Sequence, residues 1–162
     1  GTLGRLILGL LIKSTNKIKL IGDKSLSKRD FSRVTEPLKK FGVKFFFDKK
    51  GKLPLSLIGE NNPRGINYLE NKGSAQCKSS IMLASLNAVG TTSIKAKKSR
   101  DHSELLFKYL KIPIKIKKKT NYDFIDIQKP QKIKAFNYQI PGDISSSAFF
   151  WYLLFCQIIQ DY

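Results

Sequence analysis

The period of apolar residues changes along the chain, which predicts alternating helices and strands. From Leu3 to Lys13 and from Asp30 to Phe41 apolar residues recur every three or four positions, as on a helix with one buried face. Gly42 follows the second segment as a helix stop. Shorter segments rich in β-branched and aromatic residues predict strands over Lys17–Ile21, Val43–Asp48, Leu55–Gly59 and Gly65–Leu69.

The same series of elements then begins again. The pattern predicts helices over Ser74–Ala88, Asp101–Leu110 and Ser145–Gln160. It predicts strands over Thr92–Lys97, Ile112–Lys118, Tyr122–Gln128 and Lys132–Gln139. We therefore expect an α/β fold.

An internal repeat supports this reading. The segment Lys28–Val34 aligns with Ser99–Leu105, and the two share Arg, Asp and Ser at positions 71 apart. Each segment opens a predicted helix that precedes two strands. The period is too long for the common solenoids. It predicts one domain over residues 1–162, made of βαβαββ units at about 1–73 and 74–143 and the start of a further helix at 144–162.

A formal charge of +18 raises the question of a nucleic-acid partner. The lysines are spread along the whole chain, and no zinc-finger, RNP or helix-turn-helix pattern accompanies them. A solvated lysine-rich surface is therefore favoured over specific nucleic-acid binding. Cys77 and Cys156 lie in apolar stretches and His102 has no partner at ligand spacing, so we expect a reducing cytoplasmic location and no metal.

Neither apolar run predicts a membrane or export segment. No small-residue cleavage site follows Leu6–Ile12, and Phe149–Ile159 is shorter than the roughly 20 residues that span a bilayer. Because Gly1 opens in the middle of a patterned motif, we expect the chain to be an internal piece of a longer protein.

Four polar segments lie at strand-to-helix junctions, where free backbone N–H groups attract phosphate. They are Gly22–Arg29, Gly73–Ser80, Ser99–His102 and Pro141–Ala148. The alternative is ordinary helix capping, by Ser27 or Asp30 in the first segment and by Asp143 or Ser145 in the last. The sequence contains no Gly-x-x-x-x-Gly-Lys loop, no Gly-x-Gly-x-x-Gly and no nucleophile with a neighbouring base, so these residues cannot complete a reaction.

Five motifs in order resemble the 5-enolpyruvylshikimate-3-phosphate synthase family, and together they span almost the whole chain. Gly1–Leu6 is similar to the family's Gly-Thr-x-x-Arg-Leu, Leu20–Arg29 to Leu-Thr-Gly-Asp-Glu-Ser-Leu-Ser-Lys-Arg, and Ser74–Ser79 to Ser-Ala-Gln-Val-Lys-Ser. Ser99–His102 and Pro141–Ser146 match the family pattern.

This resemblance implies an inside-out α/β barrel, in which three βαβαββ units form each of two domains. It also implies a reaction in which the 5-hydroxyl of shikimate 3-phosphate attacks C2 of phosphoenolpyruvate, C3 is protonated, and the adduct expels phosphate. The family's catalytic Asp and Lys lie in the other domain, and its amino-terminal Lys-Ser pair would precede Gly1. The resemblance therefore implies no catalytic residue in this chain, no cofactor, and no activity of the chain alone.

The same resemblance implies the binding residues. Those expected to hold phosphoenolpyruvate are Gly1, Arg29 and Gln76. Those expected to hold shikimate 3-phosphate are Ser74, Ala75, Gln76 and Ser99. Arg5 and Arg100 would add positive potential nearby, and the full-length protein would be a monomer without a membrane or specific nucleic-acid partner.

Three positions depart from the family pattern. Asp30 replaces Pro after Arg29, which places a carboxylate beside the expected anion site; Lys24 replaces Glu, and Cys77 replaces Val. Two rivals stay open at this point. One is a UDP-N-acetylglucosamine enolpyruvyl transferase, whose motifs fit less well, and the other is a basic RNA-cyclase-like module, which a salt-sensitive affinity for RNA would reveal.

Overall fold

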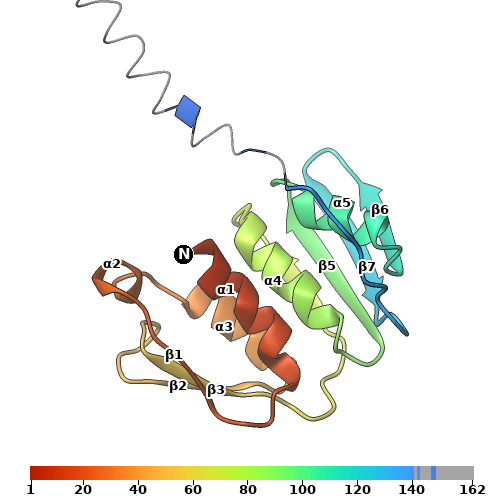
Figure 1. Ribbon diagram of the computed structural model, residues 1–162. Helices are drawn as coiled ribbons and strands as arrows, with labels where there is room; N and C mark the ends of the chain where they lie inside the picture. The colour runs from red at the N-terminus through yellow and green to blue at the C-terminus, as the bar shows by residue number, and fades with distance from the viewer. Residues whose placement is uncertain (141, 143–146, 149–162) are drawn as a thin grey trace, which may run out of the picture.

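The central helices lie between two β-sheets in the computed structural model, which describes residues 1–140, 142, 147 and 148 (Figure 1). The helices are α1 (Thr2–Leu10), the 3₁₀ turn η1 (Leu11–Lys13), α2 (Lys24–Ser27), α3 (Ser32–Lys39), α4 (Ala75–Ser85) and α5 (His102–Tyr109). The first sheet has the order β1-β3-β2 and is antiparallel; its strands are β1 (Ile18–Leu20), β2 (Lys44–Phe47) and β3 (Leu55–Ile58).

The second sheet has the order β4-β5-β7-β6. Its strands are β4 (Asn67–Glu70), β5 (Thr91–Lys97), β6 (Ile114–Lys118) and β7 (Tyr122–Gln128). β4 runs parallel to β5, and the other neighbours are antiparallel. Although the sequence pattern put β4 at the end of the first unit, its pairing joins it to the second sheet. The division at residue 73 stays a prediction.

Helices α1 and α4 run side by side in the same direction. The Gln76 side chain donates to the Thr2 hydroxyl near their N-terminal ends, and Asn87, just beyond α4, donates to the carbonyl of Leu10. Between these contacts Gly9 faces Ser80, where a Cβ built on the glycine would lie 2.1 Å from the Ser80 carbonyl oxygen. The helix pair can approach this closely only because Gly9 has no side chain.

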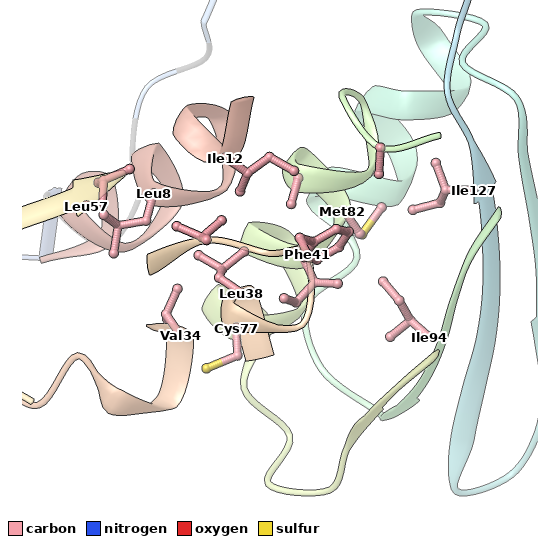
Figure 2. Close-up of a cluster of buried hydrophobic side chains, with 14 of the residues drawn as sticks. Leu8, Ile12, Val34, Leu38, Phe41, Leu57, Cys77, Met82, Ile94 and Ile127 are labelled. Atoms are coloured by element: carbon pink, nitrogen blue, oxygen red, sulfur yellow. The ribbon is translucent and has the colours of Figure 1, made fainter. Parts of the chain in front are cut away.

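One apolar core joins both sheets through the helices (Figure 2). Eight of the eleven residues of α4 are buried, whereas β5 alternates between buried and exposed positions. Helix α4 is therefore interior and the sheet that contains β5 has an outer face, and this mixed architecture confirms the predicted α/β class. Contributors to the core include Leu8, Leu38, Leu57, Met82, Ile94 and Ile127. Burying a side chain of this size contributes roughly 1.5–3 kcal/mol.

Most predicted elements are confirmed with shortened ends, but the strand predicted over Lys132–Gln139 is wrong. This segment is non-regular in the structure, and its Phe136 and Tyr138 rings pack edge-on against Tyr109 of α5. Alternation along an extended chain puts residues 136 and 138 on one side, so a helix surface satisfies the pattern without a partner strand. The helix predicted over Ser145–Gln160 lies, apart from residues 147 and 148, outside the described residues.

The short helix α2 was not predicted, although its signal is present. Asp23 occupies the N-cap position and its carboxylate accepts a hydrogen bond from the Leu26 N–H at 2.6 Å.

Within the described part of the chain, no helix is long and apolar enough to cross a membrane.

The close approach of α1 and α4 predicts that Gly9→Ala destabilises the chain. Overpacking against a backbone oxygen is expected to lower the free energy of unfolding by about 1–3 kcal/mol. Gly4→Ala is the matched control in the same helix, because its Cβ would lie 3.6 Å from the nearest Phe31 atom and the change should stabilise the helix by roughly 0.5–1 kcal/mol. Urea unfolding followed by circular dichroism measures both, and equal effects would contradict the packing argument.

Candidate functional site

Three side chains connect the N-terminal ends of α1 and α4. Arg5 donates from Nη1 to Oε1 of Gln76 at 2.6 Å and from Nη2 to the backbone oxygen of Asp30 at 3.1 Å. Gln76 in turn donates from Nε2 to Oγ1 of Thr2 at 2.8 Å. Arg5 therefore holds the first turn of α4 and the segment before α3 in a fixed relation to α1.

Arg29 lies against Gly1, the N-cap residue of α1. A Cβ built on Gly1 would be 2.6 Å from Nη1 of Arg29, so a larger residue at position 1 would displace the guanidinium group. Through Thr2 and Arg5, the same end of α1 contacts Gln76. The structure thus brings Gly1, Arg29 and Gln76 together, although 47 positions separate the last two.

Ser74 is the N-cap of α4, where its hydroxyl accepts a hydrogen bond from the Cys77 N–H at 3.3 Å. The capping alternative therefore holds for this residue, and it does not exclude ligand contact. A hydroxyl that accepts through a lone pair can still donate its proton. Ala75 and Gln76 follow as the first two helical residues, whose backbone N–H groups have no acceptor within the helix.

Ser99 lies in the segment that leads from β5 to α5. Its hydroxyl oxygen is buried and has no hydrogen-bond partner in the described part of the chain. The next residue, Arg100, lines a pocket of about 190 Å³ between α1, α4 and α5, together with Thr2, Leu6, Ala75, Gln76, Ser79, His102 and Ser103. Among the described residues, no hydrogen bond or salt bridge joins Ser99 to Arg29.

In the polar segment before α3, Asp23 is the N-cap of α2, whereas Asp30 lies one residue before Phe31, the N-cap of α3. Asp30 accepts a hydrogen bond from the Ser32 N–H at 2.8 Å, and its own backbone oxygen accepts from Arg5. The Ser32 N–H and hydroxyl lower the pKa of the Asp30 carboxyl below its ordinary value, with smaller contributions from Arg33 and Arg5. A fixed negative charge therefore stands next to Arg29.

Two features of this site were not expected from the sequence. The motif Gly1–Leu6 suggested only positive potential for Arg5, whereas the structure makes it a tether between three segments. Lys78 is fully buried beneath the segment that carries Ser99. Lysine side chains are mostly exposed, so its residue type alone did not predict this burial. The small residues Ser79 and Ser80, which follow Lys78, did indicate in the sequence that this helix packs closely against a neighbour.

Fold and site together define a class: an α/β domain of interior helices whose N-terminal ends and arginine side chains make one end electropositive. A family model described as EPSP synthase (3-phosphoshikimate 1-carboxyvinyltransferase) matches residues 1–155, and the chain belongs to this family.

Individual relatives agree with the family match. The 3-phosphoshikimate 1-carboxyvinyltransferase of Caldicellulosiruptor bescii is 41% identical over 160 residues, which cover 97% of this chain and 37% of the relative. The Bacillus subtilis protein of the same name is 41% identical over 152 residues, 93% of this chain and 34% of the relative. A structure of EPSP synthase from Acinetobacter baumannii superposes with a TM-score of 0.78 at 36% identity, covering 93% of this chain and 33% of the other. The chain thus spans about a third of the length of these relatives.

The hydrogen bonds to Asp30 predict how its carboxyl titrates. In the folded chain its pKa should lie below 3.8, so its contribution to stability is present above that pH and is lost as pH falls through the folded-state pKa. Ser32→Ala removes the hydroxyl and keeps the N–H, so the pKa should rise and still remain below 3.8. Carboxyl ¹³C NMR titration measures this, and an unchanged pKa in Ser32→Ala would contradict the assigned cause.

Proposed function

We propose that the chain is part of an enzyme that transfers the enolpyruvyl group of phosphoenolpyruvate to the 5-hydroxyl of shikimate 3-phosphate and releases phosphate. The observation that carries this proposal is the meeting of Gly1, Arg29 and Gln76 at one end of α1. The name shared by the relatives, 3-phosphoshikimate 1-carboxyvinyltransferase, supports it.

In this proposal Gly1, Arg29 and Gln76 hold phosphoenolpyruvate. The Arg29 guanidinium donates charge-assisted hydrogen bonds to an anionic group of the substrate, and Gly1 leaves room for that guanidinium. Arg5 and Thr2 fix the amide of Gln76, and the second N–H of this amide remains available to a ligand. The amide is thereby oriented before the substrate arrives.

Shikimate 3-phosphate is held by Ser74, Ala75, Gln76 and Ser99. The start of α4 offers backbone N–H groups to the ligand, which is a common way to bind a phosphate or carboxylate. Ser74 adds the proton of its capping hydroxyl, and Ser99 adds a hydroxyl that no protein group uses in the described structure. Arg100, which lines the adjoining pocket, contributes positive charge.

The role of this chain in the reaction is to bind and orient. The 5-hydroxyl loses its proton and its oxygen forms a bond to C2 of phosphoenolpyruvate, while C3 gains a proton. The resulting adduct then loses a proton from C3 and breaks its bond to phosphate, which restores the double bond. Arginine and N–H donors stabilise the anionic groups, while the proton transfers require groups outside this site.

The proposal extends to organisation and location. We propose that residues 1–162 form part of one domain with repeat units at about 1–73 and 74–143, and that the complete protein is a cytoplasmic monomer that needs no cofactor. The buried free thiol of Cys77 supports a reducing compartment. The RNA-cyclase-like and UDP-N-acetylglucosamine alternatives are not favoured, since the family match covers almost the whole chain.

The isolated 162-residue chain is expected to show no enolpyruvyl transfer, because the groups that move protons are not among its site residues. Phosphate release from phosphoenolpyruvate and shikimate 3-phosphate measures this, with the Bacillus subtilis relative as the positive control. Turnover by the pure chain would contradict the division of roles.

In the complete enzyme, Arg29→Ala and Ser99→Ala should weaken different ligands. Loss of a charged hydrogen bond in Arg29→Ala should cost about 1.5–3 kcal/mol of phosphoenolpyruvate binding, and loss of the Ser99 hydroxyl about 1 kcal/mol of shikimate 3-phosphate binding. Ser74→Ala is a less clean test, since it also removes the cap of α4.

Calorimetry with each ligand measures both losses. Arg33→Ala is the matched control, because it removes the same charge four positions away on the exposed side of α3. Equal weakening of both ligands by Arg29→Ala would make Arg29 a structural residue and would contradict its assignment.

A further inference from the structure

The most deeply buried charge in the described structure belongs to Lys78 in the first half of α4. Its side chain is 1% exposed, and its ammonium group lies 2.5 Å from a carboxylate oxygen of Glu104, which is 4% exposed. Nζ also donates to the backbone oxygen of Arg100 at 2.9 Å. Buried ion pairs contribute little to stability compared with apolar residues of the same volume. The directional bond to Arg100 is therefore the feature that an apolar residue could not supply.

That bond fixes the segment between β5 and α5. Arg100 is clamped through its carbonyl, and the next residue, Asp101, is held by Lys118 at 3.0 Å. On the other side of the Arg100 clamp lies Ser99, whose buried hydroxyl has no partner in the described part of the chain. The protein thus anchors the Arg100 carbonyl and the Asp101 side chain, and it leaves the neighbouring Ser99 hydroxyl unused in the described structure.

We propose that Lys78 is a positioning residue for Ser99. By holding the Arg100 carbonyl, it sets the backbone of the 99–101 segment so that the Ser99 hydroxyl faces the phosphate of bound shikimate 3-phosphate. Lys78 does not touch the ligand, since its ammonium is enclosed by Glu104 and the Arg100 carbonyl. The inference rests on the proposed function of this site.

The test uses the complete enzyme and separates position from stability. Lys78→Met alone would leave the Glu104 carboxylate buried without a cation, so the informative variant is Lys78→Met/Glu104→Leu, which replaces the pair with apolar residues. We expect this variant to fold with a near-normal Tm. Its KM for shikimate 3-phosphate should rise about fivefold, the effect of one lost neutral hydrogen bond, with kcat and the KM for phosphoenolpyruvate changed less than about twofold.

A double-mutant cycle tests whether Lys78 acts through Ser99. Ser99→Ala should raise the same KM by about fivefold, and adding Lys78→Met/Glu104→Leu to it should change the KM by less than about twofold further. Ile127→Val is the stability control. Ile127 is buried at the end of β7 that lies away from the 99–101 segment, so this change should leave both KM values unchanged.

Three results would overturn the inference: an unchanged KM in Lys78→Met/Glu104→Leu, equal changes for both substrates, or independent multiplication with Ser99→Ala. Hydrogen exchange in the ligand-free enzyme gives a readout without substrate, since the amides of residues 99–101 should exchange faster in the variant while those of α4 do not. A different result would contradict the proposed function itself: a complete wild-type enzyme that shows no enolpyruvyl transfer. The comparisons among variants test only the role of Lys78.

Discussion

The contact between Gly9 of α1 and Ser80 of α4 is the constraint on which the rest of the structure depends. It lets two helices from successive parts of the chain run side by side with their backbones almost touching. Their N-terminal ends are therefore level, and Gln76 reaches both Thr2 and Arg5. A wider spacing would break these bonds and separate the residues proposed to bind phosphoenolpyruvate. The geometry of the candidate site thus depends directly on how closely α1 and α4 pack.

An interior helix such as α4 needs partners for every polar group that it carries. Ser80 donates to the carbonyl of Arg5, Ser85 donates to the carbonyl of Met82, and Lys78 pairs with Glu104. Each of these bonds satisfies a buried donor that would otherwise destabilise the fold. The polar residues of the Ser74–Ser79 motif therefore divide into two groups. Those at the start of α4 remain accessible to a ligand, and those one turn later hold neighbouring segments in place.

Much of the fold could be predicted from the sequence, because helix and strand periods are local properties. The predicted strand over Lys132–Gln139 was wrong because alternation reports a one-sided environment, which here is the surface of α5 rather than a sheet. Motifs located the candidate site residues, whose binding roles stay predictions. The tether from Arg5 to Gln76 and the clamp from Lys78 to Arg100 join residues 71 and 22 positions apart, and no local pattern encodes such contacts.

The parallel course of α1 and α4 also has an electrostatic consequence. Each helix carries a macrodipole equivalent to roughly half a positive charge at its N-terminal end, so two parallel helices place like partial charges next to each other. Arg5 and Arg29 add full positive charges at the same end. Positive charge is therefore concentrated at this end of the helix pair, and the Asp30 carboxylate offsets part of it. At the proposed binding site, anion affinity and the stability of the ligand-free form are therefore opposed: a substitution that disperses this positive charge should stabilise the fold and weaken the proposed binding.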